Sequence, residues 1–202
     1  WIRPAIDRSS QEISYEVVVG GEPTFERSVQ RGEATCIATG AAIPGAYIKA
    51  AGQAGELKSQ LMAIVAEGSR ERIYCEPTSA DAAAAACERP SHLPSGRMSD
   101  HPQYMGTPRY GLDEWWRLFT DRQLVALTTF GDLLEAVHGR VLVDALAAGM
   151  ASDDVALRDG GSGARAYADA VVTYLAFAVD KCADYWSTAC SWHNTGEKMR
   201  NT

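Results

Sequence analysis

The sequence predicts an α+β protein, with a small antiparallel β-rich part first and a hairpin of two long helices after it. Short β-branched and aromatic runs, separated by Gly, Pro and charged clusters, fill the first third of the chain and are typical of short strands. Apolar residues then recur at helical spacing in two long segments of the second half. With 46% hydrophobic residues among 202, the chain can bury a sizeable core.

The first region, residues 1–77, is expected to hold a small antiparallel sheet. Its strands are expected at ISYEVVV (13–19), AYIKAAG (46–52), QLMAIVAEG (60–68) and RIYCEP (72–77). The break EGSRER between the last two runs contains Gly and Ser, which permit a tight turn. We therefore expect those two runs to pair.

A short helix and a long loop are expected over residues 78–111. Thr78 can cap the helix, Asp81 stands at its third position, and the alanines that follow favour helix. From Arg89 to Gly111 the chain is rich in Pro, Gly and Ser and is long for an internal loop. Large side chains in this loop either pin it to the protein or contact a partner: Tyr104, Met105 and Tyr110.

The last region, residues 112–202, is expected to contain a helical turn at 112–119 and then two long helices. Thr120, with Gln123 three residues later, forms a capping-box pattern that begins the first long helix. The apolar stripe of this helix is Leu124, Leu127, Leu134, Val141 and Ala145. His138 falls on this stripe. We expect it to be a core histidine with a hydrogen-bond partner, and the alternative is that it serves as a ligand or a base.

The second long helix is expected from about Ala164 to Cys190. Its main stripe is predicted to be Tyr167, Val171, Leu175, Ala178, Cys182, Tyr185 and Ala189. Apolar residues also occupy much of its remaining surface, which predicts packing on more than one side. The glycine-rich stretch DGGSGARAY (159–167) before it can present N–H groups to an anion, but a nucleotide fingerprint follows a buried strand. We expect Ser162 to cap the helix instead.

Composition limits the function classes. The net charge of −7 argues against a surface that binds phosphate backbones throughout, so any contact with nucleic acid is expected to be local. The five cysteines are odd in number and irregularly spaced, which fits reduced thiols in a cytoplasmic protein. The apolar run AVVTYLAFAV (170–179) is about half the length that spans a bilayer, so no membrane segment is expected.

The stretch GEATCIATGAAIPG (32–45) places Cys36 where a zinc ribbon carries a Cys-x-x-Cys pair followed by glycine. A structural zinc site needs four ligands, usually as two close pairs. Thr39 stands where the second thiol would be, and neither Cys75 nor Cys87 offers another pair. No metal ligand is therefore predicted. The sequence also contains no recognisable hydrolase, nucleotide-binding or metalloprotease motif, so no catalytic residue is nominated.

Four segments, taken together and in this order, are similar to one protein family. They are GEATCIATGAAIP, YIKAAGQAGELKSQLMAIVAEGSRERIYCEPT, PRYGLDEWWRLFTDRQLVALTTFGDLL and YADAVVTYLAFAVDKCADYWSTACSWHNTGEKMRNT. They cover well over half of the chain. The family they resemble consists of large prokaryotic adenine-specific DNA methylases with a zinc ribbon and a conserved domain of unknown function near the N-terminus. One departure is Trp186, where the family tends to have a small polar residue.

The resemblance implies an insert between the two halves of a methylase. In the family, the glycine-rich motif that binds S-adenosylmethionine lies upstream of such a region, and the Pro-Pro-Tyr motif that holds the flipped adenine lies downstream. This sequence contains neither motif, and WIRPAIDRSS at its start has no initiator Met, as in a piece of a longer chain. The parent is therefore expected to be an S-adenosylmethionine-dependent DNA adenine-N6 methyltransferase. The segment alone is expected to hold no cofactor.

The same resemblance implies that the stretch around Cys36 is a degenerate ribbon turn. The family's second knuckle is similar to Cys-Pro-x-Cys-Gly, and its first knuckle lies upstream of the region that this sequence matches. Here Cys36 and Gly40 keep the pattern of the turn, while Thr39 replaces the second thiol. The turn is therefore expected to keep its shape without a metal.

The role implied for the segment is an accessory one, placing DNA while the flanking methylase halves perform the chemistry. Arg109, Tyr110, Arg122 and Gln123 are the candidates for contacts to phosphates or base edges. The alternative, which the residues themselves favour, is that the first pair anchors the loop and the second lies in a solvated first helical turn. A different interpretation is a structural or protein-interaction insert, whose long helices brace the methylase or dock a partner subunit. Exposed apolar helix surface would then allow a homodimer.

Overall fold

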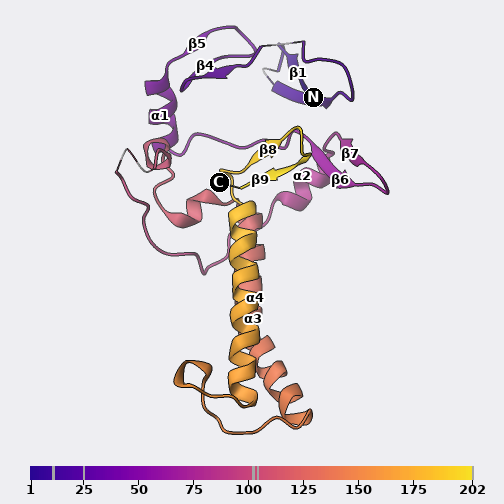
Figure 1. Ribbon diagram of the computed structural model, residues 1–202. Helices are drawn as coiled ribbons and strands as arrows, with labels where there is room; N and C mark the ends of the chain where they lie inside the picture. Colours follow the sequence, from indigo (N-terminus) through magenta and orange to yellow (C-terminus); the bar gives the residue numbers. More distant parts are fainter. Residues whose placement is uncertain (11, 25, 102, 104, 202) are drawn as a thin grey trace. The chain divides into compact units, whose positions relative to one another are not determined.

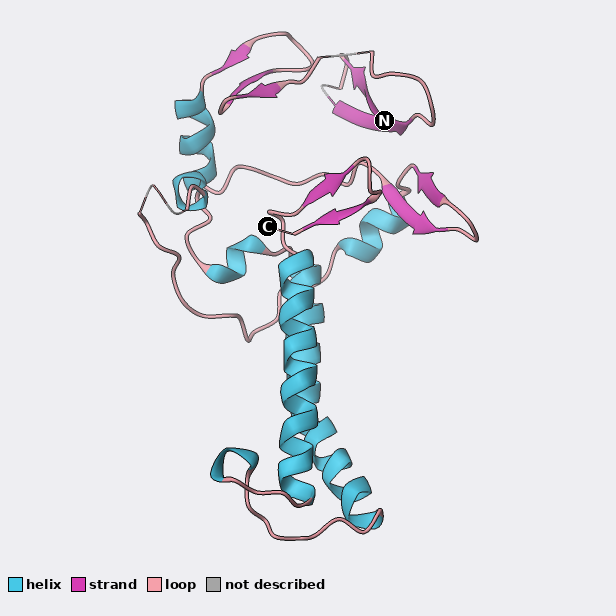
Figure 2. Ribbon diagram, in the orientation of Figure 1, coloured by secondary structure: helices cyan, strands magenta, loops and turns pink. Residues whose placement is uncertain are grey.

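The computed structural model describes residues 1–10, 12–24, 26–101, 103 and 105–201. The chain divides into two compact units. Unit 1 consists of Trp1–Ala86 and Gly96–Arg117, and unit 2 consists of Cys87–Ser95 and Leu118–Thr202. Unit 1 contains short strands and short helices, whereas the long helices belong to unit 2 (Figures 1 and 2). The predicted α+β class is confirmed.

The strands of unit 1 form small antiparallel sheets. β1 (Ile2–Asp7) pairs with β2 (Glu12–Val17), and Ile2 lies opposite Val17. Beyond them, β3 (Val29–Gln30), β4 (Glu33–Thr35) and β5 (Ala42–Ile43) make a three-stranded ribbon. The strand pattern predicted β2 but neither β1 nor β3–β5, because the short runs in these places do not alternate in hydrophobicity. A ribbon-like turn around Cys36 was expected from the family resemblance alone.

The turn between β1 and β2 is fixed by the side chain of Asp7. Its Oδ1 accepts hydrogen bonds from the Ser9 hydroxyl at 2.6 Å and the Ser9 N–H at 2.8 Å. These bonds favour the ionised carboxylate and lower the pKa of Asp7 to about 2. The polar side chain thus replaces the apolar contacts that a short exposed hairpin lacks.

The predicted pairing of the last two strands is confirmed. β6 (Ile64–Glu67) pairs with β7 (Arg72–Cys75), and the Gly68 N–H donates to the Glu71 carbonyl at 2.9 Å to close the turn. Side chains next to this hairpin reach the first one. The Gln60 amide donates to the Ile13 carbonyl at 2.8 Å, and the Val17 N–H donates to Glu76 at 3.2 Å.

The strand predicted at 46–52 is wrong, because this segment forms helix α1 (Gly45–Gln53). Pro44 lies directly before the helix with φ −64° and ψ 145°, so the chain enters it from an extended conformation. Ala46, Ala50 and Ala51 favour helix, and Ile48 is the one β-branched residue in the segment. Buried Ala51 and Gly52 form the packed face of α1. Helical propensity therefore outweighs the alternation that suggested a strand.

The short helix predicted after Thr78 is confirmed as α2 (Ser79–Ala85). The Thr78 hydroxyl accepts from the Asp81 N–H at 3.3 Å, and the Asp81 carboxylate accepts from the Thr78 N–H at 2.8 Å. This reciprocal pair is the capping box that the sequence indicates.

A close backbone approach joins α1 to the 3-10 helix η1 (Thr107–Tyr110) in unit 1. A Cβ atom added to Gly52 would collide with the backbone of Tyr110, and one added to Gly111 would collide with the Gly52 carbonyl. Gly111 also has φ +80°, which side chains other than glycine rarely adopt. Two glycines therefore allow the long loop to pack against α1.

Unit 2 is built on the predicted helix hairpin, α3 (Asp121–Ala147) and α4 (Ala164–Tyr185), which run side by side (Figure 1). The Thr120 capping box is confirmed, since the Gln123 amide oxygen accepts from the Thr120 N–H at 2.9 Å. The predicted α3 stripe is also confirmed. Leu124, Leu127 and Ala145 are buried, while Leu134 and Val141 are half-buried. None of the described helices is both long and apolar enough to cross a membrane.

The stripe predicted for α4 is not its main buried face. Tyr167 and Ala178 are exposed, whereas Ala164, Ala166 and Ala168 are buried. These three alanines lie in the first turns of the helix and do not share one face, since positions two apart are turned by about 200°. The helix also ends earlier than expected, at Tyr185, because Thr188 turns away and bonds the Leu118 carbonyl through its N–H at 2.7 Å. A hairpin of β8 (Ser191–His193) and β9 (Lys198–Arg200) follows.

The carboxylate of Asp153 stabilises the connection between α3 and α4, which contains the 3-10 helix η3 (Leu157–Asp159). Asp153 accepts from the Val155 N–H at 3.3 Å and from the Gly163 N–H at 3.2 Å. Gly163 is therefore the N-terminal cap residue of α4, and the prediction of Ser162 as the cap is wrong. The carboxylate of Asp153 thus accepts from the N–H of the cap residue itself, which lies directly before the first turn of α4.

His138 on α3 has the hydrogen-bond partner expected of a core histidine. Its Nε2 lies 2.8 Å from Oδ1 of Asp169 on α4, and the other oxygen of Asp169 accepts from the Leu157 N–H at 2.9 Å. One carboxylate thus joins both helices and the connecting turn. The Leu157 N–H and the His138 ring both favour the ionised form, and the pKa of Asp169 is lowered.

We predict that Gly52→Ala destabilises unit 1 by about 1–3 kcal/mol, because the new methyl group meets backbone that cannot move aside. The matched control is Gly139→Ala in α3, which meets no atom within 4 Å. That change should stabilise the helix by roughly 0.5–1 kcal/mol. Thermal unfolding followed by circular dichroism measures both. Equal effects of the two changes would contradict the close packing at Gly52.

We also predict an acid-sensitive contribution from Asp169. Its folded pKa lies below the ordinary value of 3.8, so its contribution to stability is complete above that value and is lost as the pH falls through the folded pKa. Asp169→Asn should lower the unfolding temperature near neutral pH and reduce the loss of stability on acidification. The control is Asp180→Asn, at an exposed site of α4. A parallel pH profile for Asp169→Asn and the unaltered chain would count against the interaction.

Candidate functional site

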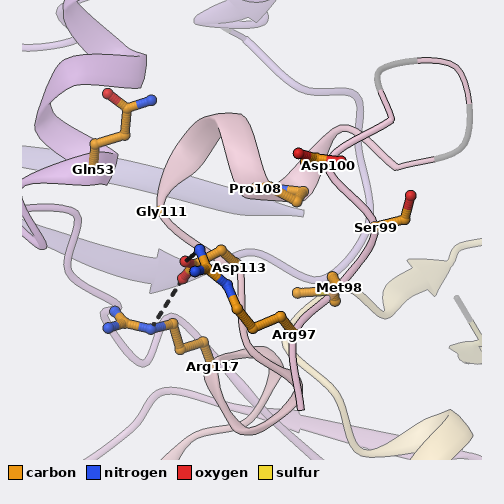
Figure 3. Close-up of a pocket in the computed structure, with 9 residues that line it drawn as sticks. All are labelled: Gln53, Arg97, Met98, Ser99, Asp100, Pro108, Gly111, Asp113 and Arg117. Atoms are coloured by element: carbon orange, nitrogen blue, oxygen red, sulfur yellow. Dashed lines mark hydrogen bonds and ion pairs between the residues drawn. The ribbon is translucent and has the colours of Figure 1, made fainter.

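Unit 1 contains a polar surface pocket with a volume of about 670 Å³ (Figure 3). One wall is an irregular antiparallel pair of segments, in which the Met98 N–H donates to the Asp113 carbonyl at 2.9 Å and the Trp115 N–H donates to the Gly96 carbonyl at 3.2 Å. α1 contributes Gln53 to the lining, and the chain at η1 contributes Pro108 and Gly111. The contact of Gly52 with Gly111 therefore also fixes the shape of this pocket.

Asp113 is the centre of the charged groups in the pocket. Its Oδ2 lies 2.7 Å from Nη2 of Arg97, and its Oδ1 lies 3.4 Å from Nε of Arg117. Figure 3 shows both arginine side chains meeting at this carboxylate. Each oxygen thus serves one guanidinium group, and each guanidinium retains further N–H groups that Asp113 does not use.

Arg117 is held on two further sides. Its Nε lies 3.2 Å from Oε2 of Glu114, and its guanidinium lies over the Trp116 ring, 4.8 Å from the ring centre. The Trp116 indole N–H donates to the same Glu114 oxygen at 3.0 Å. These residues belong to the 3-10 turn η2 (Trp115–Leu118) and the residue before it, where the sequence predicted a helical turn. Arg117 is therefore more restrained than Arg97, whose side chain is 77% exposed.

The formal charges of the pocket balance. Arg97 and Arg117 are offset by Asp113 and Asp100, which also lines the pocket. Such a pocket has no excess positive charge to attract a polyanion from a distance. The ion pairs themselves are solvent-exposed and contribute little stability, so an incoming phosphate or carboxylate group can compete with Asp113 for an arginine. The chemistry suits local polar contact.

Of the first predicted pair of contact residues, Arg109 is exposed at the end of η1, beside Pro108 of the pocket lining. Tyr110 is half-buried, and its backbone lies against Gly52. The structure thus gives Tyr110 an anchoring contact and leaves Arg109 accessible. In the same loop Met105 is half-buried, and Tyr104 lies outside the described residues.

The second predicted pair, Arg122 and Gln123, lies in the first turn of α3 in unit 2. Arg122 is exposed, whereas the Gln123 amide oxygen is engaged in the capping box with Thr120. The two pairs therefore belong to different units, and within each pair one residue is accessible and the other has a structural contact.

Sequence reasoning missed Arg97 and Arg117. The spacing of Asp113 and Arg117, four residues apart, is a local signal that would have suggested their pairing. No local signal indicates Arg97, because it meets Asp113 across 16 residues of irregular chain.

The turn that contains Cys36 connects β4 to β5. The Cys36 N–H donates to the Ala41 carbonyl and the Gly40 N–H donates to the Cys36 carbonyl, both at 2.8 Å, and Gly40 has φ +74°. The Thr39 hydroxyl, followed by the N–H groups of Thr39 and Ala38, hydrogen-bonds the sulfur and lowers the pKa of Cys36. The position that would hold a second thiol therefore supplies a donor to the first.

No group of three or more His, Cys, Asp or Glu side chains suited to a metal ion occurs in the part of the chain that the structure describes. None of the five cysteines forms a disulfide, and Cys36 is half-buried. Searches with protein-family models, of curated proteins and of solved structures found no match to this chain. The resemblance to DNA methylases therefore stays a prediction.

We predict that Thr39→Val raises the pKa of Cys36 and slows its alkylation near neutral pH, since the hydroxyl that stabilises the thiolate is removed. The rate of iodoacetamide labelling at Cys36, followed by peptide mass spectrometry across a pH series, measures the effect. Cys75, which is exposed in the same unit, is the internal reference. Thr39→Ser, which retains the hydroxyl, should label like the unaltered chain, and an unchanged pH profile for Thr39→Val would contradict the assignment.

Proposed function

We propose that this chain is a non-catalytic accessory segment of a DNA adenine-N6 methyltransferase. The resemblance of four ordered segments suggests the enzyme, and the geometry at Cys36 is the observation that best supports it. The resemblance predicts a degenerate zinc knuckle around Cys36. The chain has a tight hairpin turn here, with a glycine in the left-handed conformation and donors directed at the sulfur. A knuckle that keeps its turn after losing its metal has these features.

The proposed role of the segment is to help position DNA. Arg109 is exposed on η1, which is fixed to α1, and Arg97 and Arg117 line the adjoining pocket of the same unit. Arginines on a rigid support suit contacts to the DNA backbone, which set orientation without reading sequence. The balanced charge of the pocket and the net charge of −7 favour a few local contacts over tight independent binding.

In this proposal the flanking methylase halves of the same chain supply what the segment lacks. They bind S-adenosylmethionine, hold the flipped adenine and transfer the methyl group. The proposed location is the cytoplasm, which agrees with five cysteines that form no disulfide.

The second candidate function is a structural or protein-interaction insert that braces the enzyme or docks a partner. One observation favours it: α4 carries large exposed aromatic side chains, among them Tyr174 at 76% and Phe177 at 61%. Exposed apolar groups of this size are typical of interaction surfaces.

We predict salt-dependent binding of the full 202-residue chain to a fluorescently labelled DNA duplex, measured by anisotropy across a salt series. Arg109→Ala should weaken binding to all sequences by a similar factor and reduce the slope of log affinity against log salt by about 0.9. Arg122→Ala tests the second site in the same way. The control is Arg158→Ala, at a side chain that is 87% exposed in η3 and pairs with Asp159.

Absence of binding at low salt would refute the DNA-positioning role and leave the structural one. Equal loss from Arg109→Ala, Arg122→Ala and Arg158→Ala would mean that the chain contacts DNA through general charge alone. Loss confined to Arg109 would place the contact in unit 1.

A further inference from the structure

The β8–β9 hairpin of unit 2 has one face that carries positive charge. His193 in β8 lies opposite Lys198 in β9, and Trp192 lies opposite Met199. Directly opposite residues of an antiparallel pair share a face, and successive residues of a strand alternate between faces. Arg200, two residues beyond Lys198, therefore shares the face of Lys198 and His193, while Trp192 and Met199 lie on the other face.

The side chains at the turn agree with this placement. Nδ1 of His193 accepts from the Gly196 N–H at 3.1 Å. A Cβ atom at Gly196 would lie 2.6 Å from that nitrogen and 3.4 Å from Cε of Lys198. The imidazole and the lysine stem thus flank the same glycine. Because Nδ1 of His193 accepts, Nε2 of the neutral ring carries the proton, and this face presents hydrogen-bond donors.

Positive charge is concentrated at this hairpin, although the chain as a whole has a net charge of −7. Residues 186–200 contain one acidic residue, Glu197, against Lys198 and Arg200. Both cations are exposed, and in the described part of the chain neither is engaged in an ion pair. The two arginines of the polar pocket, in contrast, share the carboxylate of Asp113. The cations of the hairpin are therefore open to an external anion.

The hairpin is held at both of its ends by Asp184, near the end of α4 (Figure 1). Before β8, the Cys190 thiol donates to the Asp184 carbonyl at 3.3 Å. After β9, the Asn201 amide donates to Oδ2 of Asp184 at 3.2 Å, and Nζ of Lys181 lies 2.7 Å from the same oxygen. Lys181 offsets the charge of this carboxylate, so the anchor adds no net negative charge. Donors on a fixed support lose little conformational freedom on binding.

We propose that the β8–β9 hairpin is a further DNA contact, which binds the phosphate backbone of a duplex through Lys198 and Arg200. The inference rests on the proposed DNA-positioning function and places a contact in unit 2. Phosphate oxygens only accept, which matches a face of donors. Lys198 and Arg200 are about 6.8 Å apart along β9, a length over which one DNA strand presents about two phosphates. This regular spacing favours a nucleic-acid backbone over the scattered carboxylates of an acidic protein.

Fluorescence anisotropy of the full chain on a labelled duplex, measured across a salt series, tests the hairpin. Lys198→Ala/Arg200→Ala should reduce the slope of log affinity against log salt by about 1.8, because two phosphate contacts are lost. At about 100 mM salt the affinity should fall at least roughly tenfold. The charge-matched control is Lys58→Ala/Arg70→Ala, which removes two exposed cations of unit 1 and should leave the slope nearly unchanged.

A charge-preserving variant separates loss of contact from loss of structure. Lys198→Arg/Arg200→Lys should bind like the unaltered chain, since both side chains still carry a donor and a positive charge. Thermal unfolding followed by circular dichroism should be the same for all variants, because the replaced side chains are exposed. If the charge-preserving variant binds as weakly as the alanine variant, positive charge is not what binds, and the proposal is overturned.

The other outcomes separate this inference from the proposed function. If the alanine variant binds DNA as tightly as the unaltered chain, the hairpin contact is wrong and the DNA-positioning function stands. Equal loss in the Lys58→Ala/Arg70→Ala control would mean general charge attraction and would also overturn the hairpin contact. An unaltered chain that does not bind DNA at low salt would refute both.

Competition with an acidic polypeptide tests the class of partner. Unlabelled duplex should displace the labelled DNA from the unaltered chain, whereas poly-glutamate at the same concentration of charge should displace it much less. Equal displacement by poly-glutamate would make the hairpin a site for acidic proteins and overturn the assignment to DNA.

Discussion

The close approach of Gly52 to Gly111 is the constraint on which unit 1 depends. It holds the irregular chain after residue 96 against α1, although that chain has little regular hydrogen bonding of its own. The position of η1, the walls of the polar pocket and the accessibility of Arg109 all follow from it. Dense interiors transmit small steric changes, so a single methyl group at this point affects groups that it does not touch.

Unit 2 is organised by small side chains inside and carboxylates at the turn. Three alanines are buried in the first turns of α4, while Asp153 and Asp169 satisfy backbone N–H groups where the chain turns between α3 and α4. Asp153 also occupies the positively polarised end of α4, where an external anion would otherwise bind. Tyr167, Tyr174 and Phe177 of this helix are exposed.

The parts of the fold that the sequence predicts correctly are those fixed by neighbouring residues. The capping boxes at Thr78 and Thr120 need only a donor and an acceptor three residues apart, and both form. The α1 segment was misassigned because its short apolar run fits a strand or a helix equally well. The α4 stripe was misassigned because the helix is apolar on two sides, so periodicity alone does not say which is buried. The Arg97 contact to Asp113 depends on tertiary structure and has no local signal.

Unit 2 is discontinuous in sequence, since Cys87–Ser95 belongs to it while Gly96–Arg117 belongs to unit 1. Within unit 2, Arg89 lies 2.6 Å from Asp121 in the first turn of α3. A fragment that begins at residue 118 would therefore lack residues 87–95 of unit 2. The carboxylate of Asp121, at the start of α3, would lose its partner Arg89. An autonomous version of unit 2 needs residues 87–95 joined to 118 by a short flexible linker in place of 96–117. The chain is thus better suited to loop replacement than to truncation.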